Sequence, residues 1–152
     1  MLALNARGAL TASDLINAST VACTAGQFTQ LGSYTVKAGE VVTVGYGQAQ
    51  GQENAQGRIY VKLQNSTPTE VTGEVRLSIL GPQNSVLREI ARFRTEALSS
   101  STDRTKQIPL PDSMIGASED RKILMEFNPD STATLTKANC TVLIDITRTL
   151  VS

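Results

Sequence analysis

Apolar and polar residues alternate over several separate stretches of this sequence, and that alternation limits the fold more than any other feature. Within residues 140–149, Val142, Ile144 and Ile146 alternate with threonines and with Asp145. A strand with one buried and one solvated face has this period of two, whereas an amphipathic helix repeats about every 3.6 residues. Three further stretches show the same alternation: 58–64, 74–79 and 122–127.

Residues that favour turns separate these stretches. The Gly-Pro-Gln-Asn sequence at 81–84 is such a signal, and the Gly-containing turn at 37–39 predicts a hairpin over residues 34–46. Residues 85–98 fit either a helical stripe or a strand with a bulge near residues 89–90. We favour the strand, because a tight turn after a strand returns the chain antiparallel.

The predicted fold is therefore all-β, a single antiparallel β-sandwich of about 7–8 strands. No long helical stretch separates the strands, which excludes repeated βαβ units. The only helical expectation within the sandwich is one turn in residues 113–120. The spacing of the strands suits a jelly-roll or an immunoglobulin-like sandwich, and the sequence leaves the strand order open.

Residues 1–26 are expected to form an extended N-terminal arm, followed by the sandwich domain over residues 27–152. A short helical turn can begin at Ser13-Asp14, but the rest of the segment lacks helical periodicity. Only five charged residues lie within residues 1–57. A region so poor in charge is either covered by neighbouring chains or is an ordinary uncharged polar surface.

A loop is expected over residues 45–57, which contain four glycines and four glutamines. Such a loop usually becomes ordered only when a partner fixes it. We therefore expect the arm and the loop to contact other proteins. The candidate interaction residues are Leu10, Leu15, Ile16 and Val21 in the arm and Tyr46, Gln50 and Gln52 in the loop.

The chain contains no histidine and no tryptophan. Without imidazole, a Ser-His-Asp or Cys-His nucleophile is impossible and the commonest metal ligand is missing. A glycosidase with paired carboxylates needs aromatic platforms, yet aromatic residues make up only 4% of the chain. We expect no enzyme activity, no cofactor and no small-molecule substrate. Loop aspartates such as Asp112, Asp120 and Asp130 are read as solvated rather than as calcium ligands.

The 14 basic and 14 acidic residues balance, so we expect the chain to be a poor general binder of nucleic acid. One basic stretch nevertheless forms a candidate contact face for phosphate or for an acidic neighbour. Acidic residues dilute it, and a solvated strand face is the alternative. The residues of this candidate face are Arg88, Arg92, Arg94 and Arg104.

Two cysteines, Cys23 and Cys140, are too few for a disulfide scaffold or a zinc cage. Both lie among β-like residues, so buried free thiols are favoured over a disulfide. No apolar run reaches the roughly 18 residues of a transmembrane helix. The first residues also lack the basic region and apolar core of a secretory signal.

In kind, the chain resembles small viral coat, minor capsid and decoration proteins. The resemblance rests on architecture: one β-sandwich, a surface rich in Thr, Ser and Gln, an uncharged arm and no catalytic constellation. It carries no diagnostic motif and assigns no residue. It implies a location in the virion, with other copies of the chain and other capsid proteins as partners. Two alternatives are a carbohydrate- or ligand-binding module and a cell-surface or pilus-type subunit.

Overall fold

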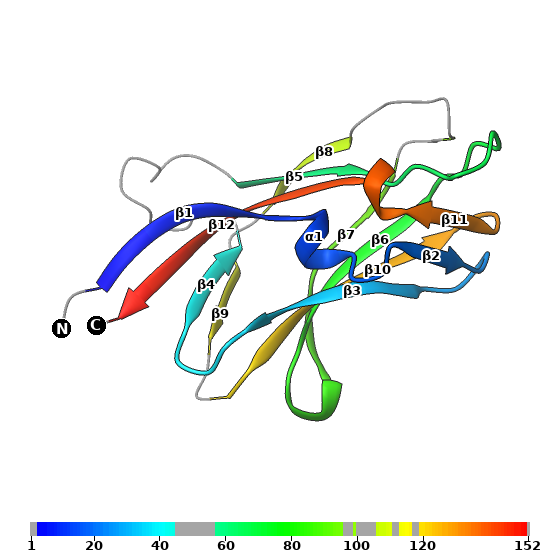
Figure 1. The fold of residues 1–152 in the computed structure, drawn as a ribbon. Coiled ribbons are helices and arrows are strands. Elements are labelled where there is room, and N and C mark those ends of the chain that lie inside the picture. The colour runs from blue at the N-terminus through cyan, green and yellow to red at the C-terminus, as the bar shows by residue number, and fades with distance from the viewer. Residues whose placement is uncertain are drawn as a thin grey trace.

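The computed structural model describes residues 3–44, 57–95, 99, 106–110, 113–116 and 119–151, which are built mainly from strands (Figure 1). In chain order the strands are β1 (Ala3–Thr11), β2 (Thr20–Cys23), β3 (Thr29–Val36), β4 (Val41–Val44), β5 (Gly57–Lys62), β6 (Gly73–Leu80), β7 (Val86–Arg94), β8 (Lys106–Leu110), β9 (Ser113–Gly116), β10 (Arg121–Pro129), β11 (Ala133–Thr136) and β12 (Thr141–Val151). The helical segments are α1 (Ala12–Leu15) and the 3-10 turns η1 (Pro82–Asn84) and η2 (Lys137–Asn139).

Two antiparallel sheets form the body of the molecule. In the first sheet, β1 pairs with one edge of β12 along its length, while β5 and β4 pair one after the other with the opposite edge. Beyond them, β8 pairs with β5 and β9 pairs with β4. The first sheet therefore has four positions: β1, β12, β4 with β5, and β8 with β9. The second sheet has the order β3-β10-β6-β7.

The strand pairs are nested within one another along the chain. The first and last strands pair with each other, as do β3 with β10, β4 and β5 with β8 and β9, and β6 with β7. Successive nested pairs alternate between the two sheets, so the chain resembles one long hairpin rolled into a sandwich. Eight strand positions in two such sheets form a jelly roll. The predicted all-β sandwich is confirmed, and its order is that of a jelly roll rather than an immunoglobulin-like fold.

The inner faces of the two sheets pack together to form one core. The alternation read from the sequence is confirmed where it is clearest, because Val142, Ile144 and Ile146 are all buried. Their partners across the core come from the second sheet, where Leu77 and Phe127 are buried as well. A small sheet of β2 and β11 lies at one end of the body (Figure 1).

Three local expectations can be compared with the strands. The bulge in β7 is confirmed, since the register with β6 shifts next to Ile90. The predicted hairpin over residues 34–46 is wrong, because β3 and β4 lie in different sheets and the turn at 37–40 crosses between them. The helical turn expected in residues 113–120 is instead the strand β9, whose pairing with β4 satisfies its backbone.

The first 26 residues do not leave the domain as an extended arm. Main-chain pairing joins β1 to β12 from Ala3 opposite Val151 to Thr11 opposite Leu143. The expected short helical turn is present as α1, which packs against β1, β3 and β12. β2 then pairs with β11. The segment stays with the body because its few large apolar side chains fill the end of the core.

Candidate interaction surfaces

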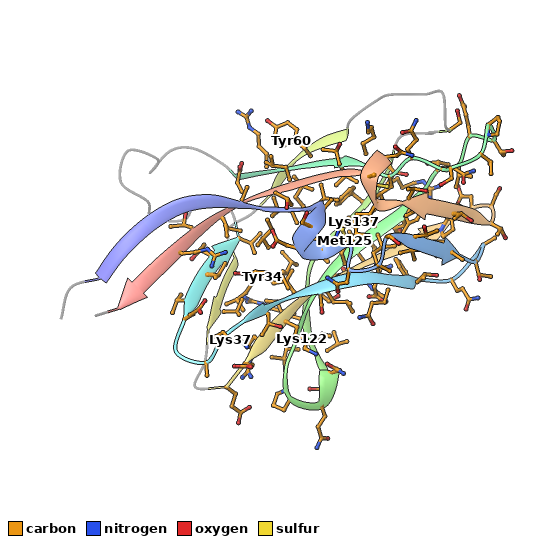
Figure 2. All side chains as sticks on the ribbon, in the orientation of Figure 1. Tyr34, Lys37, Tyr60, Lys122, Met125 and Lys137 are labelled. Carbon is orange, nitrogen blue, oxygen red and sulfur yellow. The ribbon has the colours of Figure 1, made fainter. Side chains whose placement is uncertain are left out.

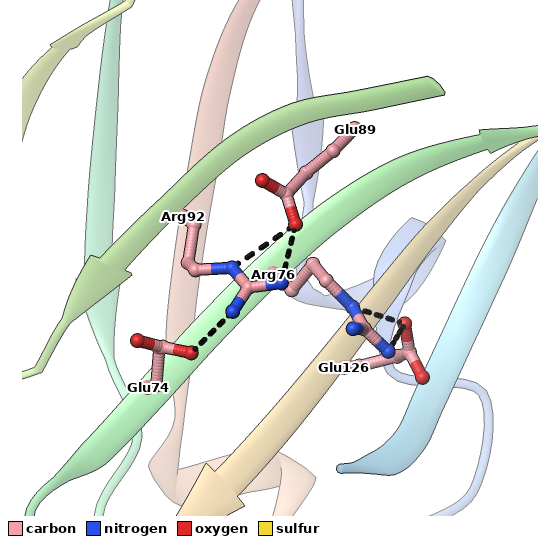
Figure 3. A network of polar contacts seen from close by, with 5 residues as sticks. All are labelled: Glu74, Arg76, Glu89, Arg92 and Glu126. Atoms are coloured by element: carbon pink, nitrogen blue, oxygen red, sulfur yellow. Dashed lines mark hydrogen bonds and ion pairs between the residues drawn. The ribbon is translucent and has the colours of Figure 1, made fainter. Parts of the chain in front are cut away.

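The outer face of the second sheet carries two neighbouring sets of ion pairs (Figure 3). Because the inner positions of β6 are apolar, the alternate residues Glu74 and Arg76 point outward. Arg76 Nε and Nη2 each lie 2.9 Å from Glu126 Oε1 on β10. On the other side, Arg92 of β7 lies 2.8 Å from Glu89 and 3.2 Å from Glu74. These contacts tie three neighbouring strands together on their solvent side.

Phe28 lies on the same face and was not identified from the sequence. The guanidinium carbon of Arg76 is 3.9 Å from the centroid of its ring, and that of Arg92 is 5.4 Å away. A guanidinium over an aromatic face is attracted by the ring quadrupole. The ring is therefore covered by cations, and the arginines are held in place by both the ring and the carboxylates.

Two of the four arginines in the candidate basic contact face are paired with acidic residues. Arg92 contacts two glutamates, and the hydrogen bond to Glu89 is the main reason why the pKa of Arg92 is raised. Arg94 pairs with Asp130. Arg88 lies by a depression near Ile115, and Arg104 is outside the described residues. A phosphate bound at Arg92 or Arg94 would therefore compete with these carboxylates.

The turn between β6 and β7 forms a tip with unusual exposure and backbone geometry, and in Figure 1 it extends below the rest of the sheet. Val86 is 66% exposed and Leu87 is 52% exposed. Gln83 and Asn84 have φ angles of 57° and 59°, in the left-handed region. Lys122 Nζ donates to Asn84 Oδ1 at 3.3 Å, which holds the turn against β10.

The predicted interaction residues of the first segment occupy the interior or the surface of this chain's own fold. Leu10, Leu15 and Ile16 are completely buried in the core, so the expectation that their side chains contact other proteins is corrected. Their burial follows from the pairing of β1 with β12 and the docking of α1. Val21 is half-buried on β2, opposite Leu135. The predicted loop residues Tyr46, Gln50 and Gln52 lie outside the described residues.

Both cysteines are free and buried, as expected. Burial is the main cause that raises the pKa of Cys23 to about 11, and the nearby Cys140 adds to the shift. Burial also raises the pKa of Cys140. At neutral pH both groups are therefore thiols, which are poor nucleophiles and poor metal ligands.

Within the described parts of the chain, no group of three His, Cys, Asp or Glu residues is placed to hold a metal ion.

A depression of about 200 Å³ lies over the outer face of the second sheet and is lined mainly by polar residues, with no aromatic side chain. No helix among the described residues has the length and apolar character needed to cross a bilayer.

Comparison with known proteins gives structural similarity only. No family model matches the chain, and no curated protein matches it. A chain from the infectious bursal disease virus Gx strain is 14% identical with a TM-score of 0.44, covering 97% of this chain and 32% of its own. A chain of the VP2 subviral particle of that virus is 11% identical with a TM-score of 0.45, and the match covers 96% of this chain and 33% of that one. The chain thus spans about one third of the length of these proteins. At these identities and TM-scores the similarity carries no argument about function.

Proposed function

We propose that this chain is a structural subunit of a virus particle and that it acts through contacts with other proteins. The observation that carries the proposal is the jelly-roll order of its strands in a chain that lacks histidine and tryptophan. Jelly rolls recur in viral capsid domains, lectins and cupins. Because one fold serves many functions, the side chains must decide among these classes.

The aromatic side chains give little support to a carbohydrate-binding role. Sugar recognition of the lectin type favours exposed aromatic rings. Here the ring of Phe28 is covered by Arg76, and Tyr34 packs against the core with Arg148 near its ring. Tyr60 lies on β5, where its hydroxyl accepts a hydrogen bond from Arg58 at 3.4 Å. Figure 2 shows Tyr34, on β3, and Tyr60, on β5, in different parts of the molecule, so these rings do not form a row on one face.

The charges favour protein partners over a genome. The chain is neutral, and Arg76, Arg92 and Arg94 are each paired with carboxylates on the outer face of the second sheet. A protein that contacts packaged nucleic acid needs a surplus of basic groups. We therefore place the chain among decoration or minor capsid subunits, with other copies and other capsid proteins as its partners.

Electron microscopy of the purified full chain tests this proposal. The samples should cover a range of protein concentration, pH and salt, because subunit contacts of this polar kind respond to ionic strength. We expect closed or symmetric assemblies of uniform size. Particles without common size or symmetry contradict the proposal.

A glycan array probes the main alternative on the same material. The proposal predicts no binding above the level of a non-lectin control protein. Saturable binding to a defined sugar, together with an absence of assemblies, would transfer the chain to the carbohydrate-binding class.

A further inference from the structure

The edges of the two sheets differ in how well they are protected from pairing with another chain. An exposed edge strand offers unpaired main-chain groups, and proteins block such edges with bulges, charges or proline. β7 has two register shifts and four charged residues. β8 contains Pro109, which has no N–H to donate. β3 has a bulge at Leu31 and is contacted by α1.

β1 is less protected than these strands over most of its length. It runs for nine residues without proline and without a register shift against β12, and its one charged residue is Arg7. α1 follows directly after Thr11, where the strand ends. Among the described residues, no strand pairs with the edge of β1 that faces away from β12.

A hydrogen bond at the end of β1 shows which of its residues direct their N–H and C=O groups to the free edge. The N–H of Thr11 donates to Asp14 Oδ2 at 2.9 Å, so it does not face β12. In an antiparallel ladder, alternate residues direct their N–H and C=O groups to opposite edges. Asn5, Arg7 and Ala9 share the parity of Thr11 and therefore offer their main-chain groups to the free edge.

We infer that this free edge pairs antiparallel with β1 of a second copy of the chain, about a two-fold axis at Ala6. This inference rests on the proposed function, since it names the surface through which copies associate. Paired in this way, the first sheet of one copy and the first sheet of the other form one continuous sheet across the dimer. A symmetric contact of this kind uses the same patch on both partners.

Charge argues against one register of this pairing and does not oppose a second copy as the partner. A two-fold axis at Arg7 would place two like charges directly opposite each other, which is unfavourable across strands. An axis at Ala6 instead places Arg7 opposite Asn5 of the second copy, and Ala3 opposite Ala9. It also leaves Thr11, whose N–H is already bonded, outside the paired region. Because the net charge is zero, two copies do not repel each other overall.

Proline at Ala9 tests the pairing, because it removes a main-chain donor from the free edge and leaves the ladder with β12 intact. Ala9→Thr is the matched control, since it changes the side chain and keeps the donor. Sedimentation velocity should show that Ala9→Pro weakens self-association about tenfold or more, because symmetry removes two hydrogen bonds. Ala9→Thr should associate like the unmodified chain.

Cysteine cross-linking supplies a second measurement that does not depend on the proline variant folding. Directly opposed residues in a non-hydrogen-bonded pair have Cα atoms about 4.5 Å apart, within the range of a disulfide. Ala6→Cys should therefore form a covalent dimer under mild oxidation. Ala9→Cys should not, because its opposite residue is Ala3.

Two results would overturn the inference in different ways. If Ala9→Pro folds and associates as strongly as Ala9→Thr, and Ala6→Cys gives no dimer, another surface joins the copies and the proposed function still holds. If the unmodified chain is monomeric at every concentration, both the pairing of β1 and the assembly role are contradicted.

Discussion

Val44 and Ile59 lie near each other along the same edge of β12, although residues 45–58 separate them in the sequence. Val44 is opposite Ile146, and Ile59 is opposite Ile144. Two residues along a strand span about 7 Å. β4 and β5 are thus one strand position of the jelly roll, interrupted by a long insertion. The intervening residues include the Gly- and Gln-rich stretch that the sequence marks as a candidate contact.

Replacing residues 45–56 with two glycines should leave the domain folded. The free energy of unfolding should stay within about 1 kcal/mol of its original value or rise slightly, because loop closure depends weakly on loop length. Urea denaturation followed by circular dichroism measures the change. Deleting Ala38-Gly39 is the control and should destabilise strongly, because that turn crosses between the sheets and Ala38 N–H donates to Asp120. An equal loss of stability in both variants would contradict the end-to-end arrangement of β4 and β5.

Gly73 should tolerate no side chain. A Cβ atom at this position would lie 2.4 Å from the carbonyl oxygen of Asn128 and 2.7 Å from Pro129 Cα. Gly73→Ala should therefore lower the free energy of unfolding by about 1–3 kcal/mol, as other forced insertions into packed regions do. Gly8→Ala is the matched control, because its Cβ would meet only Ile146 at 3.9 Å. Thermal unfolding of the two variants should differ clearly, and similar midpoints would contradict the close approach of β6 to β10.

The ion pairs on the second sheet should differ in strength according to their exposure. The side chains of Arg76 and Glu126 are 28% and 15% exposed, whereas those of Arg94 and Asp130 are 56% and 54% exposed. A double-mutant cycle with Arg76→Gln and Glu126→Gln should give a coupling of about 0.5–1 kcal/mol. The same cycle on the exposed pair should give a value close to zero. Equal couplings would mean that solvent screening does not separate the two pairs.

The buried thiol of Cys23 should make stability fall at alkaline pH. Its pKa is raised to about 11, so between pH 9 and 11 the thiol ionises in the unfolded chain before it ionises in the folded one. The unfolded state then binds fewer protons than the native state. The free energy of unfolding therefore falls by up to about 1.4 kcal/mol per pH unit. Cys23→Ala should lower stability at pH 7 and lose less stability between pH 8 and 11 than the unmodified chain. Parallel curves for the two proteins would show that Cys23 is not the group responsible.

Strands with a large apolar face could be predicted from the sequence, whereas pairing over long distances could not. The alternation of Val142, Ile144 and Ile146 follows directly from burial of one face. β1 gave no such signal because four of its nine residues are Ala or Gly and it has no Val, Ile or aromatic residue. Its strand form depends on pairing with β12 at the far end of the chain. β9 was missed for a related reason, since pairing with β4 holds a segment of weak strand preference.

The candidate contact surfaces show the same division. The basic residues of β7 could be read from the sequence, but their neutralisation depends on partners that the fold brings from other strands. Arg92 meets Glu74 and Arg94 meets Asp130 across the sheet. The arginines over Phe28 also come from distant segments. Composition pointed to the class of function that we propose, and three-dimensional pairing determines which arginines of β7 are bound to carboxylates.

The central claim is that this chain works by associating with copies of itself. Sedimentation equilibrium of the unmodified full chain over a wide range of concentration tests this claim most directly. The account predicts a mass that rises with concentration from monomer to dimer and beyond. A mass that stays at that of the monomer throughout the range would contradict it.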